Sequence, residues 1–288
     1  MANLKEIKSR IVSIGSTMQI TSAMKMVSAA KLKRAQNAIT QMRPYANKLT
    51  ELLANLSSSL ESSEQGGFSI KRKLKKVLII PITSNRGLCG GFNANVIKAS
   101  KSLCENDYKD YDSSILSIGK KSSDFFRKNN FNVISSHDEV FSNLNYESIS
   151  KIALNVMNMF VDEKFDKVVI VYNQFKNAAT QIPQVEQFLP IKPIEGGEAI
   201  TNSDYIFEPS KEEIILALIP KSLKTQLYKS IRDSFASEHG ARMTAMHKAT
   251  DNATDLRDEL LLTYNKARQA AITNEILEIV GGAEALNN

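Results

Sequence analysis

The strongest candidate for chemistry is the segment 84–93, whose sequence is Ser-Asn-Arg-Gly-Leu-Cys-Gly-Gly-Phe-Asn. It follows an apolar run, and glycines between a strand and a helix can form a turn that binds phosphate. The spacing, however, is neither GxGxxG nor GxxxxGK followed by Ser or Thr, and no lysine lies in the segment. We therefore favour a structural tight turn, with a nucleotide-binding loop as the alternative.

The cysteine of this segment, Cys89, could act as a nucleophile if a base lay beside it. The histidines are His137, His239 and His247, and none is evidently paired with Cys89. His239 and His247 are eight residues apart, whereas a helical metal-binding pair is usually about three or four apart. The sequence therefore predicts packed or solvated histidines, with no active site, no cofactor and no metal site.

Positive charge is concentrated at the N-terminus of the chain. The net charge is +6, and residues 1–56 contain nine basic residues against two acidic ones. The rest of the chain is nearly balanced. Such asymmetry indicates an acidic protein partner, a nucleic acid or an anionic membrane surface, or only a solvated helix face.

The same N-terminal segment carries a heptad pattern. Counting from Leu4 to Leu60 in alternating steps of three and four, fourteen of seventeen positions are apolar. The pattern predicts one coiled-coil helix over residues 1–60, about 85 Å long over 4–60, with a local kink at Pro44. Three positions break the stripe, and apolar residues stand beside them, so we expect the helix to change its face at Ile20, Met24 and Val27. Either a second interface or a packing adjustment would explain this break.

The C-terminal segment predicts a second long helix, over residues 208–288. Ser210 and Glu213 form a candidate capping box, and Pro220 is its main interruption. Small residues recur every four positions at Ala241, Ala245, Ala249 and Ala253, which suits two helices in close contact. A helix over 210–286 would be about 115 Å long, more than twice the diameter of a compact globule of this size. The simplest arrangement is an antiparallel two-helix coiled coil formed by the two ends of the chain, protruding from the rest.

Between these helices, residues 68–200 alternate between strand and helix patterns, which predicts a Rossmann-like α/β domain. The apolar runs expected to be strands are 77–82, where Pro81 weakens the end, and 114–118, 132–135 and 167–172. Helices are expected near 93–105, 120–129 and 148–163, and 181–189 could add an edge strand or a hairpin. The linkers into and out of this domain are expected at 57–67 and 196–204. The fold class is thus α/β, with a terminal coiled coil.

Several classes of protein are disfavoured by composition. The longest apolar runs have about six residues, far short of the roughly 20 that span a bilayer, and the N-terminus does not resemble a secretory signal. Two cysteines without a CxxC motif suggest reduced thiols in a cytosolic-type compartment. A DNA-associated coiled-coil protein with an α/β domain remains the main alternative, although Tyr45 is the only aromatic residue in the basic helix. An enzyme built on the middle domain would need a ligand at 87–91.

Three stretches carry a resemblance that covers essentially the whole chain. They are 20–29 (ITSAMKMVSA) followed by Arg43-Pro44-Tyr45, then 85–93 (NRGLCGGFN), and 264–278 (YNKARQAAITNEILE) ending in Gly282-Ala283. These stretches resemble the gamma subunit of F-type ATP synthase in its bacterial form. The resemblance implies a noncatalytic rotor shaft inside a ring of alternating alpha and beta subunits, coupling ion flow to ATP synthesis and hydrolysis.

The resemblance also implies partners and contact residues. The middle domain would lie at the foot with the epsilon subunit and the c-subunit ring, peripheral to the cytoplasmic face of the bacterial inner membrane. The basic helix would face acidic loops of the beta subunits rather than nucleic acid. Contacts with the alpha/beta head are implied for Met24, Lys25, Arg242, Gln269, Thr273 and Glu275, and foot contacts near the c ring for Tyr205 and Glu208.

Overall fold

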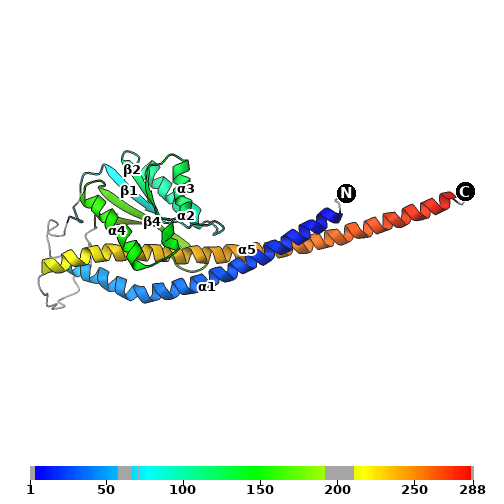
Figure 1. Cartoon of the computed structure of the whole chain (residues 1–288), viewed down its shortest axis with the longest axis horizontal. Helices are drawn as coiled ribbons and strands as arrows, with labels where there is room; N and C mark the ends of the chain where they lie inside the picture. Colours follow the sequence, from blue (N-terminus) through cyan, green and yellow to red (C-terminus); the bar gives the residue numbers. More distant parts are fainter. Residues whose placement is uncertain (1–3, 58–66, 71, 192–210, 287–288) are drawn as a thin grey trace. The chain divides into compact units, whose positions relative to one another are not determined.

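The computed structural model describes residues 4–57, 67–70, 72–191 and 211–286 (Figure 1). Tyr205, Glu208 and Ser210 therefore lie outside the described residues, as do most of the two expected linkers. The chain divides into two compact units, unit 1 formed by Met1–Ser28 with Met243–Asn288, and unit 2 formed by Ala29–Arg242. Each unit is described by itself.

The two terminal helices are continuous, as the sequence predicts. Helix α1 spans Leu4–Ser57 and helix α5 spans Lys211–Leu286. At about 1.5 Å per residue they are about 80 Å and 115 Å long. Pro44 and Pro220 lie inside the helices and do not end them, so each proline removes one backbone hydrogen bond without breaking its element.

In unit 1, side-chain contacts establish that α1 and α5 run antiparallel. The hydroxyls of Thr21 and Thr250 lie 2.8 Å apart, and the Thr254 hydroxyl lies 3.3 Å from the Met18 sulfur. The Lys25 Nζ lies 3.3 Å from Nδ1 of His247. As the α1 residue number rises, the α5 number falls by the same amount, which is the register of an antiparallel pair. The predicted coiled coil is confirmed (Figure 1).

The expected change of helix face does not occur. The heptad positions Thr21 and Ser28 are buried, with exposed fractions of 9% and 3%, whereas the neighbouring Ile20 and Val27 are 60% and 58% exposed. The seam tolerates Thr21 because its hydroxyl pairs with that of Thr250, which removes the cost of burying an unpaired polar group. The heptad register therefore passes straight through the break, and the apolar neighbours are left on the outer surface.

Unit 2 contains a five-stranded sheet of order β3-β2-β1-β4-β5. The strands are β1 (Lys76–Pro81), β2 (Asp112–Ser117), β3 (Val133–Ser136), β4 (Lys167–Phe175) and β5 (Gln181–Leu189). The first four are parallel, and β5 pairs antiparallel with β4. This order is that of a Rossmann-like fold, with the expected edge strand as its fifth member.

Strand β1 ends at Pro81, one residue before the expected limit at residue 82, in agreement with the expected weakening at this proline. Pro81 pairs with Val171 of β4, whereas the continuous pairing of β1 with β2 ends at Ile79 and Ile115. The carbonyl of Pro81 accepts from the Ile118 amide at 3.0 Å, so this residue faces β2. The missing amide hydrogen of proline thus coincides with a gap in the pairing of β1 with β2, which resumes as an isolated bridge between Ile82 and Ile118.

Helices cover both faces of the sheet. On one face lie α2 (Phe92–Ser102), continued by the π-helical turn η2 (Leu103–Asp107), and α3 (Lys120–Lys128). On the other lies α4 (Tyr146–Val161), whose N-cap Asn145 accepts from the Ser148 amide at 2.8 Å. The short 3₁₀ helix η3 (Glu139–Phe141) precedes α4. Regular alternation of strand and helix places the strands in parallel.

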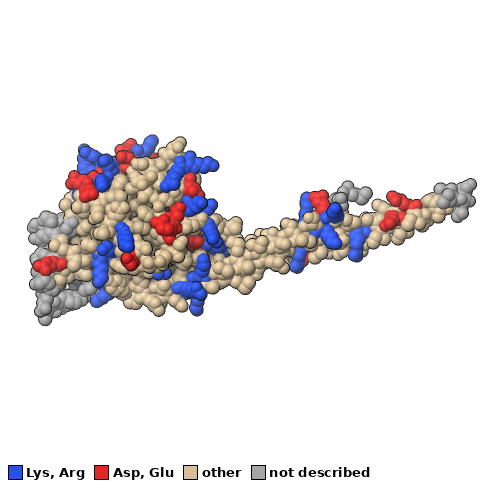
Figure 2. All heavy atoms as spheres, in the orientation of Figure 1, with Lys and Arg blue, Asp and Glu red and all other residues tan. Residues whose placement is uncertain are grey.

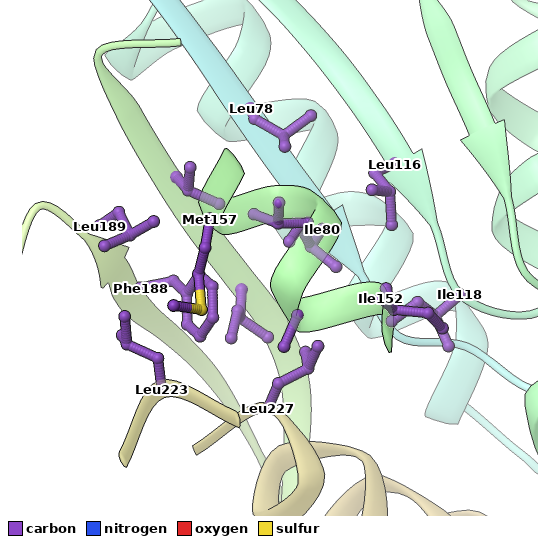
Figure 3. Packing of buried hydrophobic residues seen from close by; sticks show 14 of the residues in the cluster. Leu78, Ile80, Leu116, Ile118, Ile152, Met157, Phe188, Leu189, Leu223 and Leu227 are labelled. Atoms are coloured by element: carbon purple, nitrogen blue, oxygen red, sulfur yellow. The ribbon is translucent and has the colours of Figure 1, made fainter. Parts of the chain in front are cut away.

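The core beside α4 also includes α5. Ile219, Leu223, Leu227 and Ile231 recur every four residues along α5 and are buried with β1, β4, β5 and α4. Figure 3 shows Leu223 and Leu227 beside Phe188, Leu189 and Met157. The sequence-based division into 1–60, 68–200 and 208–288 stays a prediction. The compact units instead divide α1 after residue 28 and α5 after residue 242.

Candidate functional site

The 84–93 segment forms a tight turn between β1 and α2. Leu88 and Gly90 have left-handed backbone angles, with φ of 61° and 57°. The Ser84 hydroxyl donates to the Arg86 carbonyl at 2.6 Å, and the Ser84 amide donates to Oδ1 of Asn93 at 2.9 Å. These local bonds close the turn, which is the structural role that the sequence favours for it.

The crevice in which nucleotides bind in such folds is occupied by the chain itself. In open parallel sheets this crevice lies at the carboxyl ends of the strands where the order reverses, here between β1 and β4. The Asn173 side chain of β4 donates to the Phe92 carbonyl, and the Ser237 hydroxyl of α5 donates to the Asn173 carbonyl, both at 2.9 Å. Helix α5 therefore fills the position that a nucleotide would need.

Cys89 is packed rather than activated. It is 2% exposed, in a small cluster with Phe92 and Ala241. Burial raises the pKa of its thiol above the usual value, and Nδ2 of Asn93 lies 3.2 Å from the sulfur. Because the nucleophile is the thiolate, this shift disfavours the reactive form of Cys89.

The histidines have packing and surface positions. His239 is 5% exposed and makes an edge contact with the Phe235 ring, and burial lowers its pKa to about 3, with Arg242 and Lys31 adding to the effect. Nδ1 of His247 is exposed and lies 3.3 Å from the Asp251 carboxylate. Among the described residues, no group of three or more His, Cys, Asp or Glu side chains is placed to hold a metal ion.

Met24 and Lys25 lie in unit 1 on α1, and both are half-buried. The Lys25 side chain meets His247 of α5. Beside them, Ile20, Met26 and Val27 are 58–64% exposed, and we call these three residues the α1 patch. An apolar outer surface next to a paired seam is unusual for a soluble helical pair and indicates a binding surface.

Gln269, Thr273 and Glu275 lie in the last third of α5, in unit 1, and are exposed. Around them stand Ile272, Ile276, Leu277, Ile279 and Val280, which are 49–66% exposed and which we call the α5 terminal patch. The antiparallel register places Leu4, where the described part of α1 begins, opposite residue 268 or thereabouts. Beyond that point, α5 exposes apolar side chains that no described α1 residue faces.

The structure does not bring these two groups of residues together. Lys25 meets α5 at His247, and Gln269 lies 22 residues further along the same helix, a distance of about 33 Å. Unit 1 therefore carries two separate candidate contact regions, one on α1 and one near the end of α5.

Arg242 differs from the other implied contact residues because it is buried. Its Nη1 lies 2.5 Å from the Glu238 carboxylate, and its Nη2 donates to the carbonyls of Arg86 and Gly87 at 3.1 and 3.2 Å. Both side chains of the ion pair are 9% exposed. We call the hydrogen bonds from Arg242 to the carbonyls of residues 86 and 87 the tie. Sequence reasoning missed the tie, because nothing near Arg242 in the sequence indicates that these two residues lie against it.

Charge on the surface of unit 2 is mixed. On the face drawn in Figure 2, basic and acidic side chains lie next to one another over the sheet and its helices, without a continuous basic band. Within the described residues, no helix combines the length and apolar character that a membrane crossing requires.

The family model described as ATP synthase matches residues 3–286. The ATP synthase gamma chain of Flavobacterium psychrophilum is 65% identical to this chain, and the alignment covers 99% of each sequence. That of Flavobacterium johnsoniae is 64% identical, and the alignment covers 100% of each sequence.

A solved central stalk and c-ring of the Tetrahymena thermophila mitochondrial ATP synthase superposes with a TM-score of 0.61 at 25% identity. The superposition covers 80% of this chain and 99% of the solved chain. A Euglena gracilis mitochondrial ATP synthase structure superposes with a TM-score of 0.69 at 20% identity, covering 98% of this chain and 94% of the solved chain. At this identity the likeness supports the fold alone. The DNA-associated alternative receives no support from these comparisons. The chain belongs to the ATP synthase gamma chain family.

Proposed function

We propose that this chain is the central rotor shaft of an F-type ATP synthase, a noncatalytic subunit that couples ion flow to ATP synthesis and hydrolysis at the beta subunits. The observation that carries the proposal is the α5 terminal patch. Five large apolar side chains at the end of a helix are 49–66% exposed, and they lie beyond the described part of the helix that pairs with α5. Such a surface needs a partner that surrounds it.

The partner is the head formed by alternating alpha and beta subunits. A ring of subunits can enclose a single helix end from all sides, which buries every face of the α5 terminal patch. Gln269, Thr273 and Glu275 would then form polar contacts within the enclosure. The α1 patch, with Met24 and Lys25 beside it, would make a second contact lower on the head, against a loop of a beta subunit.

An asymmetric shaft gives the mechanism. The pair of helices exposes apolar residues on one side of α1 and basic residues such as Lys8 and Arg10 elsewhere. Three equivalent catalytic sites around the shaft would each meet a different face. A partner shifts an equilibrium only through different affinities for its states, so rotation of the shaft would change the nucleotide affinity of each beta subunit in turn.

The foot of the shaft is formed by unit 2. The epsilon subunit and the c-subunit ring are its proposed partners, with Tyr205 and Glu208 near the ring. The solved Tetrahymena relative is itself a central stalk with a c-ring. Membrane association would then arise only through the complex, at the cytoplasmic face of the bacterial inner membrane.

Reconstitution tests the assignment. The purified chain is mixed with alpha and beta subunits of the same source, and ATP hydrolysis is compared with that of the chain alone. We expect a stoichiometric, active complex and no activity from the chain alone. If the chain did not assemble and instead bound duplex DNA with a steep salt dependence, the rotor assignment would be wrong.

The α1 contact is tested with Met24→Lys, since an added charge beside the apolar α1 patch should oppose docking. The matched control is Ser13→Lys, because Ser13 is an exposed polar residue of the same helix. We expect Met24→Lys to assemble normally, and to lower ATP-driven ion pumping several-fold relative to ATP hydrolysis. Equal coupling in the two variants would refute a contact at Met24.

A further inference from the structure

The turn between β1 and α2 exposes an apolar residue in a strained conformation. Leu88 has φ of 61° and is 66% exposed. Left-handed backbone is unfavourable for a residue with a branched side chain and persists only where the surroundings hold it. We therefore expect contacts from the surrounding structure to hold the turn in this conformation, in addition to its own hydrogen bonds.

One end of the turn is fastened by its own side chains. Asn93 bonds the Ser84 amide, and Nδ2 of Asn93 also donates to the Ser84 hydroxyl at 2.9 Å. Asn85 accepts from the Lys120 amide at 3.0 Å. These bonds hold residues 84, 85 and 93. The Arg86 carbonyl accepts from the Ser84 hydroxyl within the turn at 2.6 Å, and a further connection from α5 reaches the carbonyls of Arg86 and Gly87.

Arg242 supplies that connection. One nitrogen of its guanidinium bridges the carbonyls of Arg86 and Gly87, and the other is held by the Glu238 carboxylate one turn earlier on α5. A planar guanidinium with fixed donor directions is suited to such a bridge, whereas a lysine ammonium is not. Ala241, the neighbouring residue on α5, packs against Cys89 and Phe92 of the same turn.

The position of this tie along α5 is informative. Arg242 is the last residue of unit 2, and α5 continues into unit 1 from Met243. The tie therefore lies where α5 leaves the sheet-containing unit. In a shaft that transmits rotation, this is where twisting of the helix relative to the sheet would have to be resisted.

We propose that Arg242 and Glu238 form a torsional anchor, which fastens α5 to the β1–α2 turn at the point where the helix leaves unit 2. Arg242 is then a positioning residue. It acts on coupling by fixing the turn to the helix, and not by touching the head. The mechanical part rests on the proposed rotor function, whereas the tie between Arg242 and the turn does not.

Cys89 provides a probe within the turn. The chain has two cysteines, Cys89 and Cys104, so Cys104→Ser leaves Cys89 as the sole thiol. Because Cys89 is sealed by the turn and by Ala241, release of the turn should expose it to a maleimide reagent. The labelling rate of the folded, full-length chain therefore reports the state of the anchor.

The test compares Arg242→Gln with Arg232→Gln. Arg232 is a matched control, because it lies on α5 and its Nη2 also donates to a carbonyl, that of Leu144, at 2.7 Å. We expect Arg242→Gln to label at least tenfold faster than the parent, and Arg232→Gln to label at the parent rate. Arg242→Lys, which keeps the charge beside Glu238, should give an intermediate rate and covers the case in which Arg242→Gln does not fold.

Coupling is measured on the same variants in the reconstituted complex. We expect Arg242→Gln to keep ATP hydrolysis but to lose several-fold in ATP-driven ion pumping. Parent-like labelling in both Arg242 variants would overturn the anchor, even if pumping fell, because that result fits a direct contact with the head. Faster labelling with full pumping would overturn its mechanical role. If the chain did not assemble with alpha and beta subunits, the proposed rotor function would be wrong. Labelling of Cys89 in the free chain would still test whether Arg242 holds the turn.

Discussion

Acidification should destabilise this protein through one buried imidazole. His239 is 5% exposed, and within the described residues neither of its ring nitrogens has a hydrogen-bond partner. Burial, together with the positive charges of Arg242 and Lys31, lowers its pKa to about 3. The pKa of the neighbouring Glu238 is raised, because the effect of burial exceeds the opposing effect of Arg242.

The sign and size of the effect follow from linkage. The folded pKa of His239 lies below the value of about 6.5 expected in the unfolded chain. Between these values the unfolded state binds the proton and the folded state does not, so the free energy of unfolding falls as pH falls. At about pH 5, some 1.5 units below the unfolded pKa, the loss due to His239 is about 2 kcal/mol.

The assay is urea unfolding of the full-length chain, followed by circular dichroism at about pH 7.5 and about pH 5. His239→Leu serves as the comparison, because it keeps an apolar side chain near Phe235 and removes the titrating group. Glu238 acts with the opposite sign but is present in both proteins, so their difference isolates His239. We expect the parent to lose about 2 kcal/mol more than His239→Leu. Identical pH dependence in the two proteins would refute the assignment of a neutral, buried imidazole.

Two further pairs of substitutions test the space around Gly119 and the burial of Phe160, both in unit 2. Gly119 has φ of 101°, and an added Cβ would collide with the Thr83 carbonyl, so Gly119→Ala should cost about 3 kcal/mol or more in urea unfolding. Gly15→Ala, where an added Cβ meets nothing, should instead stabilise helix α1 by about 0.5–1 kcal/mol. Phe160 is fully buried and Val161 is 47% exposed, so we expect Phe160→Ala to cost about 3–5 kcal/mol and Val161→Ala about 0.5 kcal/mol or less. Equal effects within the glycine pair would contradict the close approach of Thr83 to Gly119, and equal costs within the other pair would contradict the burial of Phe160.

The secondary structure could be predicted because its signals are local. The heptad stripe from Leu4 and the spacing of small residues in the C-terminal segment predict two long helices, and α1 and α5 are those helices. Alternating apolar runs predict the sheet of unit 2, including the edge strand at 181–189, which the structure places antiparallel beside β4. Periodicity and strand propensity are properties of a short stretch of chain, so one sequence suffices to detect them.

The candidate site was predictable only in part. The exposed positions Gln269, Thr273 and Glu275 could be carried over from a family resemblance because their neighbours in the sequence match. The burial of Arg242 could not, because its partners at 86 and 87 are more than 150 residues away. Likewise, nothing near Cys89 indicates that a residue of α5 would seal it.

The sequence by itself determined the types and lengths of the elements, the family, and the basic character of the N-terminal helix. Only the tertiary structure decided which side chains those elements bury. Thr21 and Ser28 lie in the seam while Ile20 and Val27 lie outside it, and α5 serves both as a partner of α1 and as part of the core of unit 2. The physical reason is that burial depends on what faces a residue from distant parts of the chain. Thr21 is accommodated because Thr250, 229 residues away, offers its hydroxyl.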